Sequence, residues 1–282
     1  NGAHLNGLKG LGFSFLEVGT ITPQPQKGHP KPRIFRQKEQ SALINHLGFN
    51  NCGSKKALSN LRPTPHNLPF GVNLGLNQKS VQKNALTDLF TILKTFKDTG
   101  NYFVINLSSP NTKNLINLAN KNFLHELSYH LKKDSNISLN KIWIKISPDH
   151  TKKDLQSLVA SIEDFGFCGI LLTNSHMINF PKKGGQSGHP LMLPSTTALE
   201  WAWEVHQGRL PMVGVGGVLS GSDILQKMIR GAQCVQIYTA LVYRGPWAVY
   251  ELLEELSEEL KIRKIKVLSD VIGQYYENPD LT

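Results

Sequence analysis

The chain has 282 residues, with 31 Lys and Arg against 21 Asp and Glu, which gives a formal net charge of +10. Hydrophobic residues make up 40% and charged residues 18%, a composition typical of globular proteins rather than of disordered or fibrous ones. No apolar run approaches the ~18 residues of a membrane-spanning helix, and the polar, glycine-rich start is unlike a signal peptide.

The basic residues are scattered, with no long run and no interleaved aromatic residues, so we expect no nucleic-acid partner. The three cysteines, Cys52, Cys168 and Cys234, form no C-x-x-C pair and no ligand-spaced set with histidines. They therefore predict no metal site and indicate reduced thiols. Cys168 and Cys234 lie in or beside apolar runs, so we expect both to be buried.

Seven short apolar runs recur along the chain, and each ends in small or polar residues. Most are continuous rather than alternating, as expected for parallel strands that are covered on both faces. We predict strands at Phe13–Thr20, Phe70–Gly75, Tyr102–Ser108, Ile142–Pro148, Gly169–Asn174, Pro211–Gly217 and Cys234–Thr239.

Amphipathic stretches follow most of these runs. In the first of them, Leu86, Leu89, Phe90 and Leu93 form one helical face. Gly231 is a plausible stop for the helix before it. We predict helices at Val81–Lys97, Asn122–Lys132, Lys152–Phe165, Pro194–Gln207, Ser222–Arg230 and Trp247–Lys264.

Repeated strand–helix units predict one α/β domain over residues 1–282, built on a parallel sheet. A (β/α)8 TIM barrel places its chemistry all around the carboxyl ends of the strands, whereas an open sheet concentrates it at one switch point. Polar residues end nearly every strand here, so we favour the barrel, with the first barrel strand expected before Asn1. These residues are Thr20, Asn73, Asn106, Lys145, Asn174, Gly217 and Thr239.

One connection, Thr22–Asn50, is too long for an ordinary loop between a strand and a helix. It is rich in proline and then runs through R-I-F-R and A-L-I-N-H-L-G-F. We predict an antiparallel excursion at about residues 22–50 that lies over the rim of the barrel.

Eight segments, in this order and spacing, resemble the dihydroorotate dehydrogenases of class 2, which are membrane-associated and use a quinone. Each motif alone is modest evidence, but together they span essentially the whole chain. They are E-V-G-T-I-T-P-Q-P-Q-K-G-H-P-K-P-R-I-F-R (17–36), I-N-H-L-G-F-N-N (44–51), N-L-S-S-P-N-T (106–112), I-K-I-S-P-D (144–149), L-T-N-S (172–175), G-G-Q-S-G-H-P-L (184–191), G-V-G-G-V (214–218) and Q-I-Y-T-A-L (236–241).

The cofactor of this family is FMN. The turn G-V-G-G at 214–217 fits the phosphate site that barrels form after their last strands, although alone it is weak evidence, because many barrels carry it with other phosphorylated ligands and it could also be only a tight turn. Lys145, in an apolar strand, is expected to face the rim and stabilise the reduced flavin. The resemblance implies FMN contacts at Thr20, Asn73, Asn106, Lys145, Thr173, Gly188, Gly217, Tyr238 and Thr239.

Dihydroorotate is a cyclic imide whose ring edge alternates donors and acceptors, and a side-chain amide pairs with such an edge. A single asparagine would more simply form a turn, but four fall at positions matched by the family. The resemblance implies substrate contacts at Asn45, His46, Leu47, Gly48, Phe49, Asn106, Asn111, Asn174 and Ser175. Ser175 replaces a more usual threonine and keeps the hydroxyl.

The resemblance makes Ser109 the base that removes the C5 proton of (S)-dihydroorotate, while a hydride leaves C6 for FMN. The product, orotate, is an intermediate of de novo pyrimidine (UMP) biosynthesis. The soluble classes of these enzymes use cysteine at this position, and none of the three cysteines lies there. A quinone is therefore the implied oxidant, with Arg36 and Tyr238 near the quinone end of the flavin site.

In the family, a glycine-rich strand ending in lysine precedes the position of Asn1, and a helical extension further upstream docks on the membrane. We expect a full-length parent to be active and peripheral, at the cytoplasmic face of a bacterial inner membrane or at the mitochondrial inner membrane of a eukaryote. The 282-residue chain alone is expected to bind FMN poorly. The alternatives are a related FMN barrel acting on another pyrimidine or an enoate, and an inactive FMN- or phosphate-binding remnant.

Overall fold

The computed structural model describes residues 1–61, 68–80, 84–112, 115–134, 137–179 and 181–277. Its centre is a curved sheet of seven parallel strands in the order β1-β4-β5-β6-β7-β10-β11. All seven predicted strands are present, within a few residues of their expected bounds. They are β1 (Leu16–Ile21), β4 (Phe70–Leu74), β5 (Tyr102–Asn106), β6 (Ile142–Ile146), β7 (Gly169–Leu172), β10 (Met212–Val215) and β11 (Cys234–Gln236).

The curvature of the sheet brings its first and last strands together. No described strand lies between β1 and β11, yet Gln236 of β11 donates a hydrogen bond of 3.0 Å from Nε2 to Oε2 of Glu17 on β1. The side chains of the two terminal strands therefore meet inside the curve. The predicted TIM barrel, with seven of its strands visible in this chain, is confirmed.

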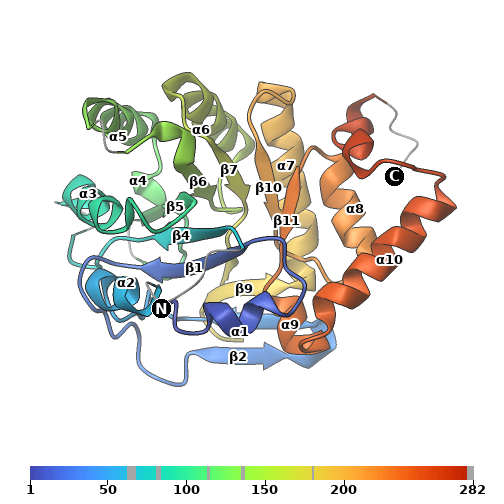
Figure 1. Ribbon diagram of the computed structural model, residues 1–282, viewed down its shortest axis with the longest axis horizontal. Helices are drawn as coiled ribbons and strands as arrows, with labels where there is room; N and C mark the ends of the chain where they lie inside the picture. The colour runs from blue at the N-terminus through green and yellow to red at the C-terminus, as the bar shows by residue number, and fades with distance from the viewer. Residues whose placement is uncertain (62–67, 81–83, 113–114, 135–136, 180, 278–282) are drawn as a thin grey trace.

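Helices cover the outside of the sheet, as Figure 1 shows for α3, α5, α6 and α7. All six predicted helices are present, although residues 81–83 of the first prediction lie outside the described residues. Gly231 follows α8 with a φ of +97°, which confirms the expected stop. The helices are α3 (Ala85–Phe96), α5 (Lys121–Lys133), α6 (Lys152–Phe165), α7 (Met192–His206), α8 (Gly221–Ile229) and α10 (Ala248–Ile262).

Several short helices were not predicted, because each is too short to show a clear apolar period. They are α1 (Leu5–Lys9), α2 (Ser54–Leu61), α4 (Leu115–Leu118) and α9 (Thr239–Arg244), with 3-10 turns at Lys38–Gln40, Leu139–Lys141, His189–Leu191, Leu268–Val271 and Gln274–Tyr276.

The core lies between the sheet and the helices. Every residue of β4 is buried, and Phe70, Phe96 and Phe103 are among the largest fully buried side chains. Each such side chain stabilises the fold by about 1.5–3 kcal/mol relative to exposure. This packing fixes the strands, and therefore the positions of the polar residues at their carboxyl ends.

A second, antiparallel sheet has the order β2-β3-β9-β8. Its strands are β2 (Ile34–Gln37), β3 (Ala42–Asn45), β8 (His176–Ile178) and β9 (Gly184–Gly188). The predicted excursion supplies β2 and β3, and Figure 1 shows β2 and β9 on the opposite side of the molecule from α5 and α6. Strand β9 was not predicted because G-G-Q-S-G has a low strand propensity, and β8 has only three residues. Glycine is needed there, since a Cβ on Gly184 would lie 2.5 Å from the carbonyl oxygen of Asn45.

The expectation that Cys168 and Cys234 are buried is wrong. Cys234 is exposed and Cys168 is only partly buried. Cys234 begins β11, a terminal strand of the sheet, so a neighbouring strand covers it on one side only. Its place in an apolar run was a poor guide to burial because edge strands are less enclosed than central ones.

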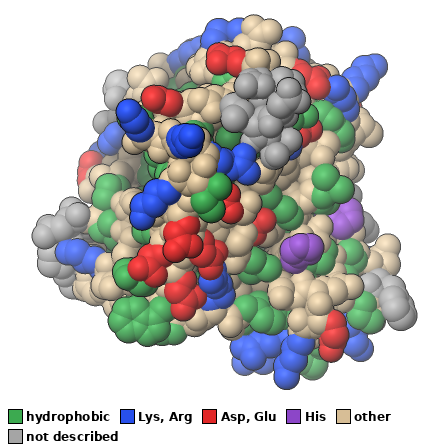
Figure 2. Space-filling model, turned by 90° about the vertical axis from the view of Figure 1, so that its right-hand side faces the viewer, with side chains coloured by type: hydrophobic (Ala, Val, Ile, Leu, Met, Phe, Trp, Pro, Cys, Tyr) green, Lys and Arg blue, Asp and Glu red, His purple; other side chains and the backbone are tan. Residues whose placement is uncertain are grey.

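The surplus of positive charge does not extend to every part of the surface. On the face shown in Figure 2, acidic side chains gather together. Helix α10 carries Glu251, Glu254, Glu255, Glu258 and Glu259, all partly or fully exposed. Among the described helices, none has the length and apolar character required to cross a membrane.

Candidate active site

A cavity of about 710 Å³ opens where the carboxyl ends of the parallel strands meet the antiparallel sheet. Its volume is in the range of small-molecule and cofactor sites. Sixteen of the eighteen site residues expected from the sequence line it. They are Thr20, Asn45, Leu47, Gly48, Phe49, Asn106, Ser109, Asn111, Lys145, Thr173, Asn174, Ser175, Gly188, Gly217, Tyr238 and Thr239.

The other two, His46 and Asn73, do not line the cavity but stand behind residues that do. His46 Nδ1 lies 3.1 Å from Oδ1 of Asn111, and its ring stacks on His29 with centroids 3.9 Å apart. Asn73 is 4% exposed and accepts hydrogen bonds from Thr20 and Asn106. Both side chains orient cavity residues, so direct ligand contact is not the role that their positions favour.

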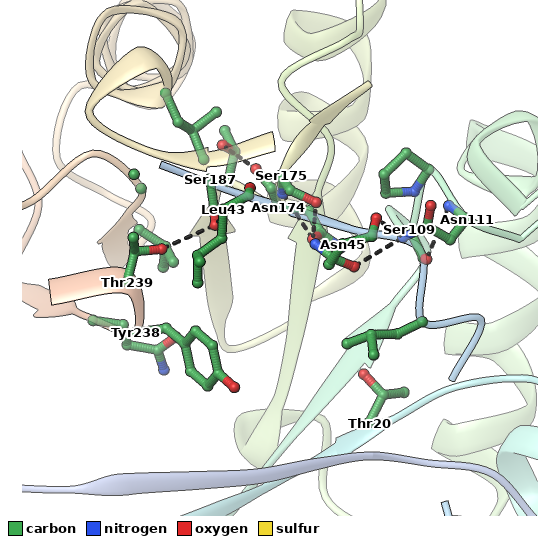
Figure 3. Close-up of a pocket in the computed structure, with 18 of the residues that line it drawn as sticks. Thr20, Leu43, Asn45, Ser109, Asn111, Asn174, Ser175, Ser187, Tyr238 and Thr239 are labelled. Atoms are coloured by element: carbon green, nitrogen blue, oxygen red, sulfur yellow. Dashed lines mark hydrogen bonds between the residues drawn. The ribbon is translucent and has the colours of Figure 1, made fainter. Parts of the chain in front are cut away.

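The four predicted asparagines lie in two hydrogen-bonded pairs, and Figure 3 labels three of them, Asn45, Asn111 and Asn174. Asn111 donates from Nδ2 to Oδ1 of Asn45 at 2.9 Å, and this pair joins the turn after β5 to the end of β3. Asn174 donates to Oδ1 of Asn106 at 3.3 Å, which joins the ends of β7 and β5. Because one partner of each pair fixes the other, the amide groups are held in place before a ligand arrives.

Ser109 lies in the turn after β5 and is 6% exposed. Its Oγ accepts a hydrogen bond of 3.3 Å from the backbone N–H of Asn111. Figure 3 shows it beside Asn45 and Asn111, across the cavity from Tyr238 and Thr239. A hydroxyl oxygen that already accepts from a backbone N–H is stabilised when negative charge develops on it.

Lys145, at the carboxyl end of β6, lies 3.9 Å from Oε1 of Glu17, and both side chains are largely buried. The same carboxylate accepts from Nδ2 of Asn73 at 2.7 Å and from Nε2 of Gln236 at 3.0 Å. A buried carboxylate with two amide donors and a cation is well compensated. Glu17 therefore holds together side chains from four strands beneath the cavity.

The wall opposite Ser109 is formed largely by glycine. Gly188, Gly216 and Gly217 have φ values of +93°, +114° and +82°, which an L side chain rarely adopts. Beside them, Oγ of Ser187 and Oγ1 of Thr239 lie 2.9 Å apart. The result is a wall of exposed backbone and hydroxyl groups, suited to an anionic group.

Three residues in or behind the cavity were not predicted from the sequence: Glu17, Ser187 and His29. A charged residue within an apolar strand was the signal that identified Lys145, and it applied equally to Glu17. Ser187 lies in a matched segment but carries no such signal. His29 is 82 residues before Asn111, whose carbonyl oxygen it approaches at 3.1 Å, so no local pattern reveals that contact.

Comparison with known proteins places these features in one family. The family described as dihydroorotate dehydrogenase matches residues 1–260. A protein of Acinetobacter baumannii named dihydroorotate dehydrogenase (quinone) is 38% identical over 272 residues, covering 91% of this chain and 81% of the relative. A protein of the same name from Methylobacillus flagellatus is 38% identical over 270 residues, covering 91% and 80%.

A solved structure is similar as well. The crystal structure of DHODH from Eimeria tenella in complex with ferulenol has a TM-score of 0.88 and 30% identity, covering 96% of this chain and 81% of that one. Sequence and structure thus agree over most of the chain. The chain belongs to the dihydroorotate dehydrogenase family.

Proposed function

We propose that this protein oxidises (S)-dihydroorotate to orotate in de novo pyrimidine (UMP) biosynthesis, with FMN as hydride acceptor and a quinone as final oxidant. Relatives named dihydroorotate dehydrogenase (quinone) support the reaction and the oxidant. The observation that carries the proposal is that Ser109 and four asparagines line or border the cavity whose other wall is a glycine-rich turn. Serine, amides and glycine together match the needs of a base, an imide and a phosphorylated cofactor.

The residues of the glycine wall fit FMN. Gly188, Gly216 and Gly217 all line the cavity, so their backbone groups are within reach of a ligand there. Backbone N–H groups and the hydroxyls of Ser187 and Thr239 are the donors that a phosphate accepts from. Bound FMN would supply the acceptor for the hydride that leaves C6 of dihydroorotate.

Lys145 would supply positive charge to the flavin ring. Its ammonium is close to Glu17 at 3.9 Å, a distance that leaves room for a further partner. Thr20 and Thr173 line the same region and offer hydroxyl groups. A cation held against the ring favours its reduced, anionic form, which assists hydride transfer.

The asparagine pairs would bind the substrate. In each pair, one amide fixes the orientation of the other, and all four asparagines line the cavity. An imide ring edge, with alternating donors and acceptors, suits such a frame. Phe49 lines the same part of the cavity and would pack beside the ring.

Ser109 would remove the C5 proton. A serine hydroxyl is a weak base, so Ser109 would have to pass its own proton to a neighbouring hydroxyl or to water as it takes the C5 proton. The backbone N–H of Asn111, 3.3 Å from Oγ, is placed to stabilise the negative charge that Oγ gains as its own proton leaves. Hydride loss from C6 at the same time would make the C5 proton more acidic.

The quinone would approach from the side of Arg36 and Tyr238. Both line the cavity, and Tyr238 is 73% exposed, so this side faces solvent. An apolar acceptor needs such an accessible entrance. Peripheral attachment to a membrane surface follows from the resemblance and is part of the proposal.

The test uses protein expressed from its full reading frame. Released cofactor is identified after denaturation, and orotate formation is followed with a ubiquinone analogue, fumarate or NAD⁺ as acceptor. We expect FMN, and orotate formation with the quinone only. Bound FMN without orotate would refute the substrate, and turnover with fumarate or NAD⁺ would refute the oxidant.

A further inference from the structure

A buried lysine lies directly behind the glycine wall. Lys227, on α8, is 0% exposed. Its Nζ donates to Oγ of Ser195, to Oγ1 of Thr196 at 2.9 Å and to the carbonyl oxygen of Met192 at 3.5 Å. These partners are all uncharged and all belong to the first turns of α7. An ammonium group completely removed from water is costly unless something compensates its charge.

Ser195 connects this ammonium to the cavity wall. Its Oγ is 2.9 Å from the carbonyl oxygen of Gly216, so only two hydrogen bonds separate Lys227 from the turn. The lysine stem also packs on β10, because a Cβ on Gly214 would lie 3.1 Å from Cβ and 3.2 Å from Cδ of Lys227. The ammonium therefore lies against the back of the turn whose front faces the cavity.

The charges around Lys227 do not compensate it well. On its own helix, Asp223 favours the charged form and Arg230 opposes it, while burial is the largest influence and lowers the pKa of Lys227 to about 7. The faces of α7 and β10 against it contribute Ser195, Thr196 and Gly214, which are neutral. On α10, Glu255 is held by Arg244 and by the backbone of Gly221.

We infer that Lys227 is a positioning residue for the phosphate of the cofactor, holding the Gly216–Gly217 turn from behind and placing a positive charge opposite a dianion bound in front. The inference rests on the proposed FMN site. This role would explain why a lysine is buried at a place where an apolar residue would destabilise the fold less. The positive charge of Lys227 is compensated only when an anion occupies the other side of the turn.

The position of Lys227 behind the turn couples phosphate binding in front of it to the uptake of a proton by the lysine. A bound dianion favours the charged lysine, so binding draws a proton onto Lys227 whenever the free protein holds it partly neutral. The phosphate itself is dianionic above about pH 6. Between about pH 7 and pH 9, FMN affinity should therefore fall as pH rises, because more of the free protein must take up that proton.

The experiment titrates apoprotein, expressed from its full reading frame, with FMN and with riboflavin, which has the same ring system and no phosphate, and follows flavin fluorescence. For the wild type, we expect the FMN-to-riboflavin affinity ratio to fall about tenfold from about pH 7 to pH 9. In Lys227→Met, which keeps the length of the stem, the ratio should be about tenfold lower at pH 7 and no longer depend on pH. Lys153→Met, at an exposed lysine on α6, is the control and should behave as wild type.

A Lys227→Met variant that keeps the wild-type ratio and its pH dependence would overturn the inference. So would a flat ratio in the wild type, a measurement that needs no variant to fold. Either result leaves the FMN site standing as long as the wild type binds FMN. If the wild type binds neither flavin, the proposed cofactor is wrong, and the inferred role of Lys227 is then wrong as well.

Discussion

Replacing Gly217 with alanine tests whether the turn at the cavity needs glycine. The φ of +82° alone should cost about 1–2 kcal/mol for a residue with a Cβ. That Cβ would also lie 2.2 Å from Cα and 2.4 Å from N of Met192, which are backbone atoms at the start of α7 and cannot rotate away. Overpacking of this kind costs about 1–3 kcal/mol, so the total should be ~2–5 kcal/mol.

The assay is urea-induced unfolding with and without excess FMN. Gly166→Ala is the matched control, because Gly166 has a φ of +83° and open space around its Cβ position. It should lose only about 1–2 kcal/mol and keep the stabilisation by FMN, which is about 2.7 kcal/mol at a hundredfold excess over Kd. Gly217→Ala should lose more stability and most of the FMN effect. Equal losses in the two variants, with FMN stabilisation intact in both, would show that the turn at the cavity does not need glycine at position 217.

Two further predictions concern the asparagine pairs and the pH dependence of folding. Asn45 and Asn111 share a hydrogen bond of 2.9 Å, so a double-mutant cycle of their alanine variants should show a coupling energy of about 0.5–3 kcal/mol in dihydroorotate binding. The coupling energy in a cycle of Asn45 with Asn174 should be smaller, and equal coupling energies in the two cycles would contradict this prediction. Burial lowers the pKa of His206 from 6.5 to about 4, so the unfolded chain binds the proton more readily and stability should fall by roughly 2–3 kcal/mol as pH drops from 6.5 to 4. Urea unfolding across this range checks it: His206→Gln should flatten the profile, while His125→Gln, at an exposed site, should not.

The strands and main helices could be predicted because their apolar residues repeat with a clear period. Lys152–Phe165 was predicted with the bounds that the structure gives it. The glycine-rich strand β9 could not be, since its pairing with β3 depends on contacts across more than a hundred residues. Long-range pairing of this kind overrides local propensity.

The cavity lining was largely predictable, but the layer behind it was not. The motif that contains His46 indicated a substrate contact, yet the side chain turns to Asn111 and His29. Side-chain direction depends on neighbours that the local sequence does not reveal. Lys227 shows this most clearly. A lysine in an amphipathic helix is expected at the surface, and only the packing of α7 and β10 around Lys227 shows that it is buried.

We propose that Ser109 acts as the base in the oxidation of dihydroorotate. The most direct measurement mixes FMN-loaded protein with dihydroorotate without oxygen or quinone and follows the bleaching of the flavin. We expect rapid bleaching in the wild type and a rate at least ~10²-fold lower in Ser109→Ala, with FMN bound in both. Bleaching of Ser109→Ala at close to the wild-type rate would contradict it.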